Sequence, residues 1–330
     1  MLTLTNIPDV ALNHILDLCD FRAMICLRKV CRDLRYKIDQ TIPDVKLSYL
    51  TVYSFEDSVV VTYGESGKVE YEKNENGTSV EEAKILENSN YLDVFFDDLN
   101  FLMKHQKSKL VDCAFLRRVT EGVDINSYFS RLTEILQSIP TPLKTKYFVL
   151  EVCNDSEIMA LLPYVDAEAL DHLWIVHPLN KRPIVSMELG QIVELEQWKN
   201  AKLIGIPGFY VTSDCLKHFI HLESSMIHIK NASLQNLKFL KNSFIHSKKF
   251  DECDFNYKSL DFKEDELSES LGEPWSDVHS RRLYWFFKRS NSEKILRIVH
   301  EPSANPRFSF TVVDLKFVPD GAIVQDVEDS

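Results

Sequence analysis

The sequence places few side chains at spacings that support catalysis. His218 and His221 stand three residues apart on an expected helix, which a metal site can use, but no third ligand accompanies them. The acidic strings at 264–266 and 97–98 could pair for general acid–base chemistry, although such strings more often form a solvated face. We therefore expect no metal, no cofactor, and a solvent-exposed position for both strings.

Motifs of known enzyme classes are missing from the sequence. None of the phosphate-binding, dinucleotide-binding, nucleophile-elbow or zinc-protease patterns occurs, and only 9 glycines are spread along the chain. The aromatic string YWFF at 284–287 could stack a ligand, but aromatic residues along a strand ordinarily form core. We predict a packed sheet there and a protein that is not an enzyme.

The 7 cysteines are an odd number and contain no C-x-x-C pair, so neither a disulfide framework nor a zinc knuckle is indicated. They are typical of reduced core residues in an intracellular protein, cytoplasmic or nuclear, and we expect Cys26 and Cys31 to be buried. The start, MLTLTNIPDV, lacks the pattern of a secretory signal, and no window resembles a membrane span. Membrane insertion is not expected.

Length and charge narrow the class further. The chain has 330 residues with 45% hydrophobic content, which suggests two folding units, each with a core. Its 50 acidic and 38 basic residues give a net charge of -12, the wrong sign for a general binder of phosphate backbones. Nucleic acid is therefore a disfavoured partner.

The N-terminal part has helical periodicity and the following part has strand periodicity. Leu12, Ile15, Leu16 and Cys19 follow the i, i+3, i+4, i+7 spacing of an amphipathic helix, and the pattern resumes after Asp20, an expected N-cap. Alternating segments then predict a β-meander over 45–75, because turn signals separate three apolar runs. Helices are expected over 79–140, in detail at 79–88, 90–107 and 126–138.

Short apolar runs recur in the second half, beginning at 147, 173, 203, 227 and 250. This spacing is near the 20–29 residues of leucine-rich-type units, so 145–258 is predicted to be a short repeat layer with one helix between successive strands. Three more strands are expected over 280–318, the acidic stretch 260–277 is expected to be an exposed helix and loop, and 321–330 a frayed tail. The fold class is α+β overall.

The N-terminal pattern resembles an F-box. The resemblance rests on Pro8, on the spaced Leu and Ile residues, and on the ending Val-Cys-Arg-Asp-Leu-Arg at 30–35. The strings at 20–22 and 27–31 look like those of the F-box proteins that are expanded in nematodes, in which an FTH domain follows the F-box. The layout of residues 45–320 is similar to such a domain, with the F-box at 1–44.

The resemblance implies docking on a Skp-family adaptor, which links an F-box to a cullin and a RING subunit in an SCF-type ubiquitin ligase. Independently, about 40 residues of helix cannot bury their own apolar stripes. The residues predicted to bind the adaptor are Ile7, Pro8, Leu12, Ile15, Leu16, Phe21, Met24, Leu27, Val30 and Cys31. Electrostatic support is predicted from Arg28, Lys29, Arg32 and Arg35, because Skp-family adaptors are generally acidic.

The C-terminal part is then expected to hold a target protein, with 171–179, 201–212 and 224–233 as coarse candidate surfaces. Three functions remain open at this stage. The first is a non-catalytic adaptor that recruits a target for ubiquitin transfer, and the second is a scaffold or regulator outside any ligase. The third is a stand-alone enzyme, which only the missing motifs oppose.

Overall fold

The structure is a computed structural model of the whole chain. It describes residues 7–41, 44–64, 67–80, 84–117, 125–178, 185–263, 265–276, 281–290 and 292–326. Two compact units divide the chain, Met1–Leu170 and Asp171–Ser330. The predicted N-terminal helices and meander therefore share one unit, whereas the sequence placed a domain boundary after residue 44. Glu264, the first residues of the chain and the end of the predicted tail lie outside the described residues.

Three helices form the N-terminal part of the first unit, as the resemblance to an F-box, a module of three helices, implies: α1 (Asp9–Asp17), α2 (Phe21–Arg28) and α3 (Arg32–Thr41). The expected cap is present, because the Asp20 carboxylate accepts a hydrogen bond from the Ala23 N–H at 2.7 Å. Leu16 and Ile38 are fully buried between these helices and the rest of the unit. We call α1–α3 the helical module.

The first unit contains a seven-stranded mixed sheet in the order β7-β6-β1-β2-β3-β4-β5. The predicted meander corresponds to the antiparallel strands β1 to β3. The strand β1 also pairs in parallel with β6, which pairs in parallel with β7. The strands are β1 (Tyr49–Ser54), β2 (Ser58–Tyr63), β3 (Gly67–Asn74), β4 (Gly77–Val80), β5 (Lys84–Glu87), β6 (Leu110–Arg117) and β7 (Thr145–Glu151).

The prediction of a helix over 79–88 is wrong. That segment contains β4 and β5, which continue the meander as antiparallel neighbours of β3. The hydrogen-bonded ladder with β3 outweighs the helix propensity of these residues. Thr78 supports the strand as well, because it is buried and its hydroxyl donates to the Ser89 carbonyl oxygen at 3.1 Å. The strand β6 was also not predicted, because its run LVDCAFLR lies between two strongly periodic helices.

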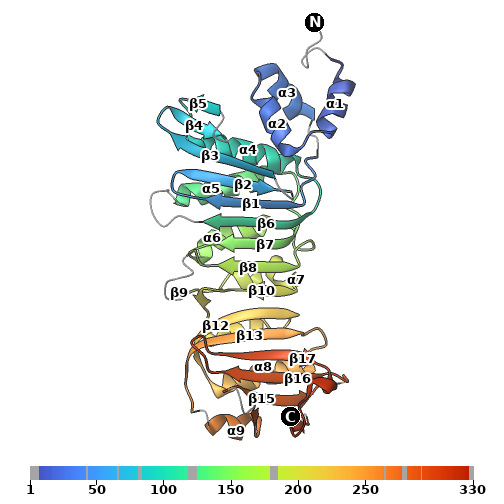
Figure 1. Cartoon of the computed structure of the whole chain (residues 1–330), viewed down its shortest axis with the longest axis vertical. Helices are drawn as coiled ribbons and strands as arrows, with labels where there is room; N and C mark the ends of the chain where they lie inside the picture. The colour runs from blue at the N-terminus through green and yellow to red at the C-terminus, as the bar shows by residue number, and fades with distance from the viewer. Residues whose placement is uncertain are drawn as a thin grey trace. The chain divides into compact units, whose positions relative to one another are not determined.

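Helices cover one face of this sheet, and the other face is bare (Figure 1). The predicted helices at 90–107 and 126–138 are present as the long helices of the layer. The covering elements are α4 (Tyr91–His105), α5 (Ile125–Ser138), α6 (Asp155–Leu161) and the short 3-10 helix η1 (Leu162–Tyr164). The apolar residues Phe95 and Leu102 of α4 are fully buried against the strands, which fixes α4 in the layer.

The second unit has a mixed sheet in the order β14-β15-β16-β17-β13-β12-β10-β8. The strands β8, β10, β12 and β13 are mutually parallel, and β17, β16, β15 and β14 follow as antiparallel neighbours. The bounds are β8 (His172–Val176), β10 (Leu203–Gly205), β12 (Ser224–Ala232), β13 (Glu252–Leu260), β14 (Trp275–Ser276), β15 (Leu283–Lys288), β16 (Ile295–Glu301) and β17 (Arg307–Val313). A separate parallel pair joins β9 (Val185–Ser186) to β11 (Phe209–Tyr210).

The connections between the parallel strands are uneven. The segment between β12 and β13 is a full helix, α8 (Leu234–His246), whose N-terminus carries a reciprocal capping box between Ser233 and Asn236. The earlier connections contain only short pieces, namely η2 (Ile192–Glu194), α7 (Glu196–Asn200) and η3 (Ser213–His218). The expectation of one helix per repeat holds for α6 and α8, and the likeness to leucine-rich repeats stays a prediction.

The C-terminal strands form a packed sheet end, as expected for the aromatic string at 284–287. Trp285, Phe286 and Phe287 are all buried, and β18 (Val324–Gln325) pairs in parallel with β15 beside Phe286. The prediction of a frayed tail is therefore wrong for 321–326, because the Gln325 amide donates to the Leu271 carbonyl oxygen at 2.6 Å. The acidic stretch holds α9 (Asp265–Leu271), which buries Leu271 on its inner side.

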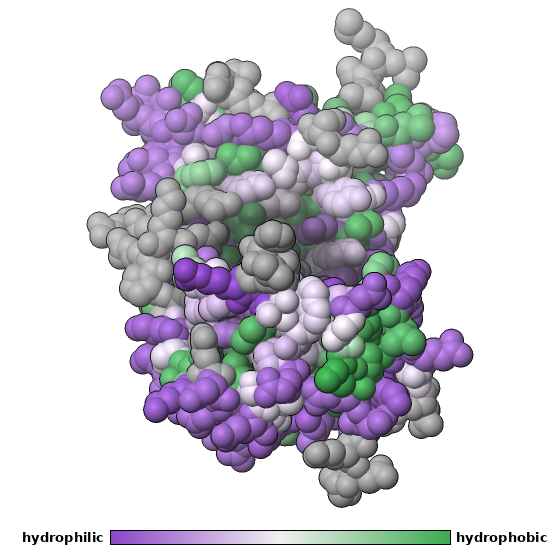
Figure 2. All heavy atoms as spheres, turned by 60° about the horizontal axis from the view of Figure 1, so that its bottom comes forward, coloured by the Kyte–Doolittle hydropathy of each residue, from purple (hydrophilic) through white to green (hydrophobic). Residues whose placement is uncertain are grey.

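Exposed apolar side chains lie close to the chain end in the second unit. Leu315, Phe317 and Ile323 are 59%, 58% and 68% exposed, and the first two belong to the 3-10 helix η4 (Leu315–Phe317). Figure 2 brings the bottom of Figure 1 forward and shows a group of hydrophobic residues on an otherwise largely hydrophilic surface. Such groups mark surfaces that take part in contacts.

Candidate functional site

The structure separates the residues predicted to bind an adaptor into an inner and an outer group. Leu12, Leu16, Phe21 and Met24 are at most 2% exposed and form the interior of the helical module and its contact with the sheet. The ring of Phe21, for instance, meets the Tyr63 ring of β2 edge-on, with centroids 5.0 Å apart. These four side chains are held by the chain itself.

The outer group remains accessible. Ile15 is 37% and Val30 69% exposed, Pro8 and Cys31 are exposed, and Ile7 and Leu27 are half-buried. Two apolar residues that the sequence reasoning did not select are even more open, since Val10 is 83% and Leu18 76% exposed. The helical module thus exposes apolar side chains on α1 and on the turn between α2 and α3. Other apolar side chains, such as Leu12 and Leu16, already fill its interior.

The basic residues of the helical module mostly have partners inside the first unit. The Arg28 guanidinium binds Asp39 through two atoms, at 2.7 and 3.3 Å, and lies 4.2 Å above the centroid of the Phe101 ring of α4. Lys29 forms an ion pair with Asp98, and Arg35 pairs with Asp97 at 2.7 Å. Arg28, Lys29 and Arg35 therefore fasten the module to α4, and Arg32 is exposed.

Asp98 is the centre of this attachment, and the prediction that it lies on a solvated face is wrong. The Asp98 side chain is 4% exposed and forms an ion pair with Lys29. Its carboxylate accepts a hydrogen bond from the Tyr71 hydroxyl at 2.9 Å, and the Arg28 guanidinium lies 3.6 Å away. Burial raises the pKa of the Asp98 carboxyl, while Lys29, Tyr71 and Arg28 act in the opposite direction. Asp97, one residue earlier, is exposed as expected, because it faces the other side of the helix.

The cysteines also differ from expectation. Cys26 and Cys31 are exposed, so the prediction that they are buried is wrong: α2 turns Met24 and Ile25 inward, and Cys31 lies in the turn before α3. Cys113 and Cys253 are buried, and burial raises the pKa of both thiols, that of Cys253 to about 12. All seven cysteines are free.

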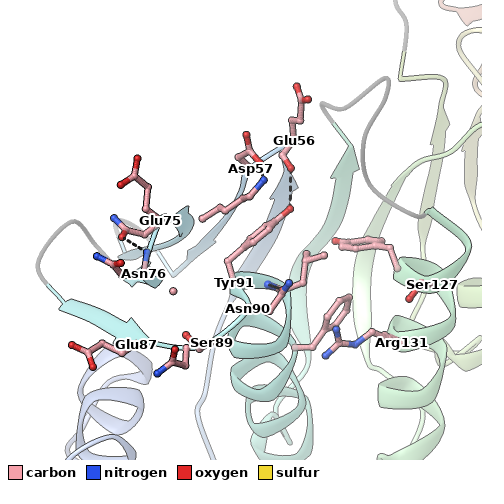
Figure 3. A pocket seen from close by; sticks show the side chains of 17 residues that line it. Glu56, Asp57, Glu75, Asn76, Glu87, Ser89, Asn90, Tyr91, Ser127 and Arg131 are labelled. Atoms are coloured by element: carbon pink, nitrogen blue, oxygen red, sulfur yellow. Dashed lines mark hydrogen bonds and ion pairs between the residues drawn. The ribbon is translucent and has the colours of Figure 1, made fainter.

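A second accessible feature of the first unit is a cleft of about 1090 Å³ between three strand ends and the helices α4 and α5. Figure 3 shows Glu56 and Asp57 above it, Glu75 and Asn76 at one end, and Ser127 and Arg131 on the α5 side. The Tyr91 hydroxyl donates to the Glu56 carbonyl oxygen at 2.9 Å, which ties the β1–β2 turn to α4. Sequence reasoning missed this cleft because its residues come from four separate stretches of the chain, within 56–57, 73–77, 87–96 and 127–131.

One face of the second sheet carries a row of residues in register, of which Trp174, Met226 and Asp254 are half-buried. Trp174 of β8 stands beside Gly205 of β10, which stands beside Met226 of β12 and then Asp254 of β13. The Trp174 ring lies over Gly205, because a Cβ atom built on Gly205 would stand 2.4 Å from that ring. Strand pairing thus brings the three coarse candidate surfaces, 171–179, 201–212 and 224–233, next to one another.

The remaining sequence candidates for chemistry have structural roles. The Trp198 indole N–H donates to the His218 carbonyl oxygen at 3.0 Å, and the His221 ring lies 3.2 Å from the Trp198 carbonyl oxygen. In the described ranges, no group of three or more His, Cys, Asp or Glu side chains is placed to hold a metal ion. None of the helices there has the length and apolar content needed to cross a membrane.

Comparison with known families agrees with both halves of this arrangement. A family model of the F-box domain matches residues 4–46, which contain the helical module, and a model of the FTH domain matches residues 126–273. The chain therefore contains an F-box domain followed by an FTH domain. An F-box indicates in general an adaptor of SCF-type ubiquitin ligases that takes part in protein–protein interaction. No curated protein matches the sequence.

Proposed function

We propose that this chain is a non-catalytic adaptor of an SCF-type ubiquitin ligase, in which the helical module docks on a Skp-family subunit and the FTH part holds a target protein. The observation that carries the proposal is the accessible apolar group on the F-box helices. Val10, Ile15, Leu18 and Val30 are all more than a third exposed, while the module interior is complete without them. The exposure of four apolar side chains within one small module supports a partner surface there.

The structure narrows the docking residues that the sequence proposed. Ile15 and Val30, with Pro8, Leu27 and Cys31, are the accessible members, whereas Leu12, Leu16, Phe21 and Met24 support them from below. Arg32 remains a candidate for charge attraction to an acidic adaptor. Arg28, Lys29 and Arg35 contribute by holding the module on α4.

Docking is tested by co-purification of the full chain with a Skp-family adaptor. Ile15→Asp and Val30→Asp each place a charge in an apolar interface, and we expect each to weaken binding about tenfold or more. Tyr36→Asp is the matched control, because Tyr36 is 68% exposed on α3 outside the proposed set. Wild-type protein that binds no adaptor, or aspartate variants that bind as well as wild type, would leave the scaffold function as the better account.

For the target we propose the face of the second sheet around the half-buried Trp174 and Met226, inside the FTH match. A ring supported by a glycine on a rigid sheet is a typical anchor, because it offers area at a small entropic cost. Proximity labelling with the full chain tests this surface. We expect Trp174→Ala with Met226→Ala to lose the labelled target, and Leu315→Ala with Phe317→Ala, equally apolar but outside the FTH match, to retain it. The opposite pattern would move the target site to the chain end.

A further inference from the structure

The cleft of the first unit has the form of a binding site and lies outside the F-box match. Its walls are the β1–β2 turn, the β3–β4 turn, the segment from Glu87 to Asn90, and the first turns of α4 and α5. The walls are fixed by internal bonds: the Asn88 N–H donates to the Asn76 carbonyl oxygen at 3.0 Å, and the Asn76 N–H donates to the Asn74 side chain at 3.1 Å. A preformed hollow with fixed walls requires little reorganisation on binding.

The size of the cleft favours a polypeptide segment over a small molecule. Its volume of about 1090 Å³ lies at the upper limit of small-molecule pockets, which range from roughly 300 to 1,000 Å³. Glu75 and Asn76 lie on one side of the cleft and Ser127 and Arg131 on the other (Figure 3). An extended chain several residues long can lie along such a trough.

The charges around the cleft define the chemistry of the occupant. Both cations of the lining are already neutralised, since Lys73 pairs with Asp57 at 3.0 Å and Arg131 pairs with Asp93 at 2.7 Å. Glu56, Glu75 and Glu87 are exposed on the rim, and none of them has an ion pair among the described residues. The field at the opening is therefore negative and attracts a cationic ligand.

The floor of the cleft is aromatic. Phe96, Tyr91 and Tyr128 line it, and their rings are between 3% and 8% exposed. The Arg131 guanidinium covers the Phe96 ring at 4.2 Å from its centroid, so Tyr91 and Tyr128 are the floor rings that this cation does not cover. Aromatic edges also suit the apolar stems of Lys and Arg side chains.

We propose that this cleft binds an extended, positively charged peptide segment of a protein partner, with Lys or Arg side chains against Glu56, Glu75 and Glu87. The occupant lies along the trough, and the apolar stems of its basic side chains contact the accessible edges of Tyr91 and Tyr128. Polyanions such as nucleic acid are opposed by the rim charge. The inference does not depend on adaptor docking, since every residue that lines the cleft lies C-terminal to the F-box match.

The test selects peptides that bind the immobilised full chain from a displayed library of random 12-residue sequences. The selected peptides are then synthesised, and their affinities are measured by fluorescence anisotropy. We expect enrichment of peptides with two or more Lys or Arg residues. The triple variant Glu56→Gln, Glu75→Gln, Glu87→Gln should weaken their binding at least tenfold. The matched control is Glu188→Gln, Glu269→Gln, Glu273→Gln, which removes the same charge from exposed positions of the second unit and should change binding less than twofold.

Hydrogen exchange with the bound peptide locates the site. Protection is expected in segments 54–58, 74–78, 87–92 and 127–131, which line the cleft, and none in the second unit. A selection without basic enrichment or without any binder, equal weakening by both triple variants, or protection elsewhere would each overturn the proposal. Spermine serves as the small polycation: if it binds alone with the same dependence on the three glutamates and displaces every peptide at equal concentration, the occupant is a free polyamine and the peptide proposal fails.

Discussion

Asp98 offers the sharpest test of how the helical module is held. Asp98→Asn keeps the shape of the side chain and one hydrogen bond with Tyr71, but it removes the charge that faces Lys29 and Arg28. Loss of one partner of a buried ion pair costs roughly 3–5 kcal/mol in general. In this protein Arg28 retains its ion pair with Asp39, and the Lys29 side chain is 18% exposed to water. The expected decrease in the free energy of unfolding is therefore smaller, about 2 kcal/mol.

Asp97→Asn is the matched control on the same helix. Asp97 pairs with Arg35 at 2.7 Å, but the two side chains are 64% and 48% exposed, so this pair contributes only about 0.5 kcal/mol. A contrast of roughly fourfold in destabilisation between neighbouring aspartates is therefore expected from burial alone. The two substitutions remove the same charge, which cancels any effect of net charge.

The assay is urea unfolding followed by far-ultraviolet circular dichroism, because all 4 tryptophans, at 174, 198, 275 and 285, lie in the second unit and do not report on the first. Hydrogen exchange adds the location: Asp98→Asn should speed exchange in peptides covering 21–41 and leave those covering 283–301 unchanged. The reasoning is refuted if Asp98→Asn lies within about 0.5 kcal/mol of wild type, or if Asp97→Asn is equally destabilising.

The other predictions concern buried groups elsewhere in the chain. Burial lowers the pKa of His300 from 6.5 to about 4, so the unfolded state takes up a proton before the folded state does as the pH falls below 6.5. The stability contributed by neutral His300 is complete above that pH and is lost towards pH 4. Between pH 7.5 and pH 5, the free energy of unfolding of the wild type should therefore fall by about 2 kcal/mol more than that of His300→Gln in urea titrations. The variant His246→Gln, at an exposed position, should behave like wild type. Gly205→Ala should displace the Trp174 ring, cost about 1–3 kcal/mol and alter tryptophan emission, and an unchanged emission spectrum would contradict the placement of that ring. A thiol reagent followed by peptide mass spectrometry should modify Cys26 and Cys31 rapidly in native protein, and Cys113 and Cys253 only after unfolding, since these two are buried; rapid native labelling of Cys113 would show that the packing described for β6 is wrong.

The sequence by itself determined the elements that have a strong hydrophobic periodicity, and it identified the domain that carries a specific sequence motif. The spacing of Leu12, Leu16 and the residues after Asp20 was enough to predict helices there, because helical periodicity and a cap are local properties, whereas the number of three followed from the resemblance to an F-box. The motif ending at 30–35 was enough for the F-box, as the family match at 4–46 confirms. The runs at 147, 173, 203, 227 and 250 likewise predicted β7, β8, β10, β12 and β13, since buried parallel strands are continuous apolar segments.

Only the tertiary structure decided which side chains of those elements remain accessible. Ile15 and Leu16 are neighbours in one apolar stripe, yet one is 37% exposed and the other is fully buried, because the other helices of the module cover only part of α1. In the sequence, Asp97 and Asp98 are indistinguishable members of an acidic pair. The rotation between successive helical residues exposes Asp97 to water and places Asp98 against Lys29 and Tyr71. The cleft is a property of segments brought together from residues 56 to 131, and no local pattern encodes such a meeting.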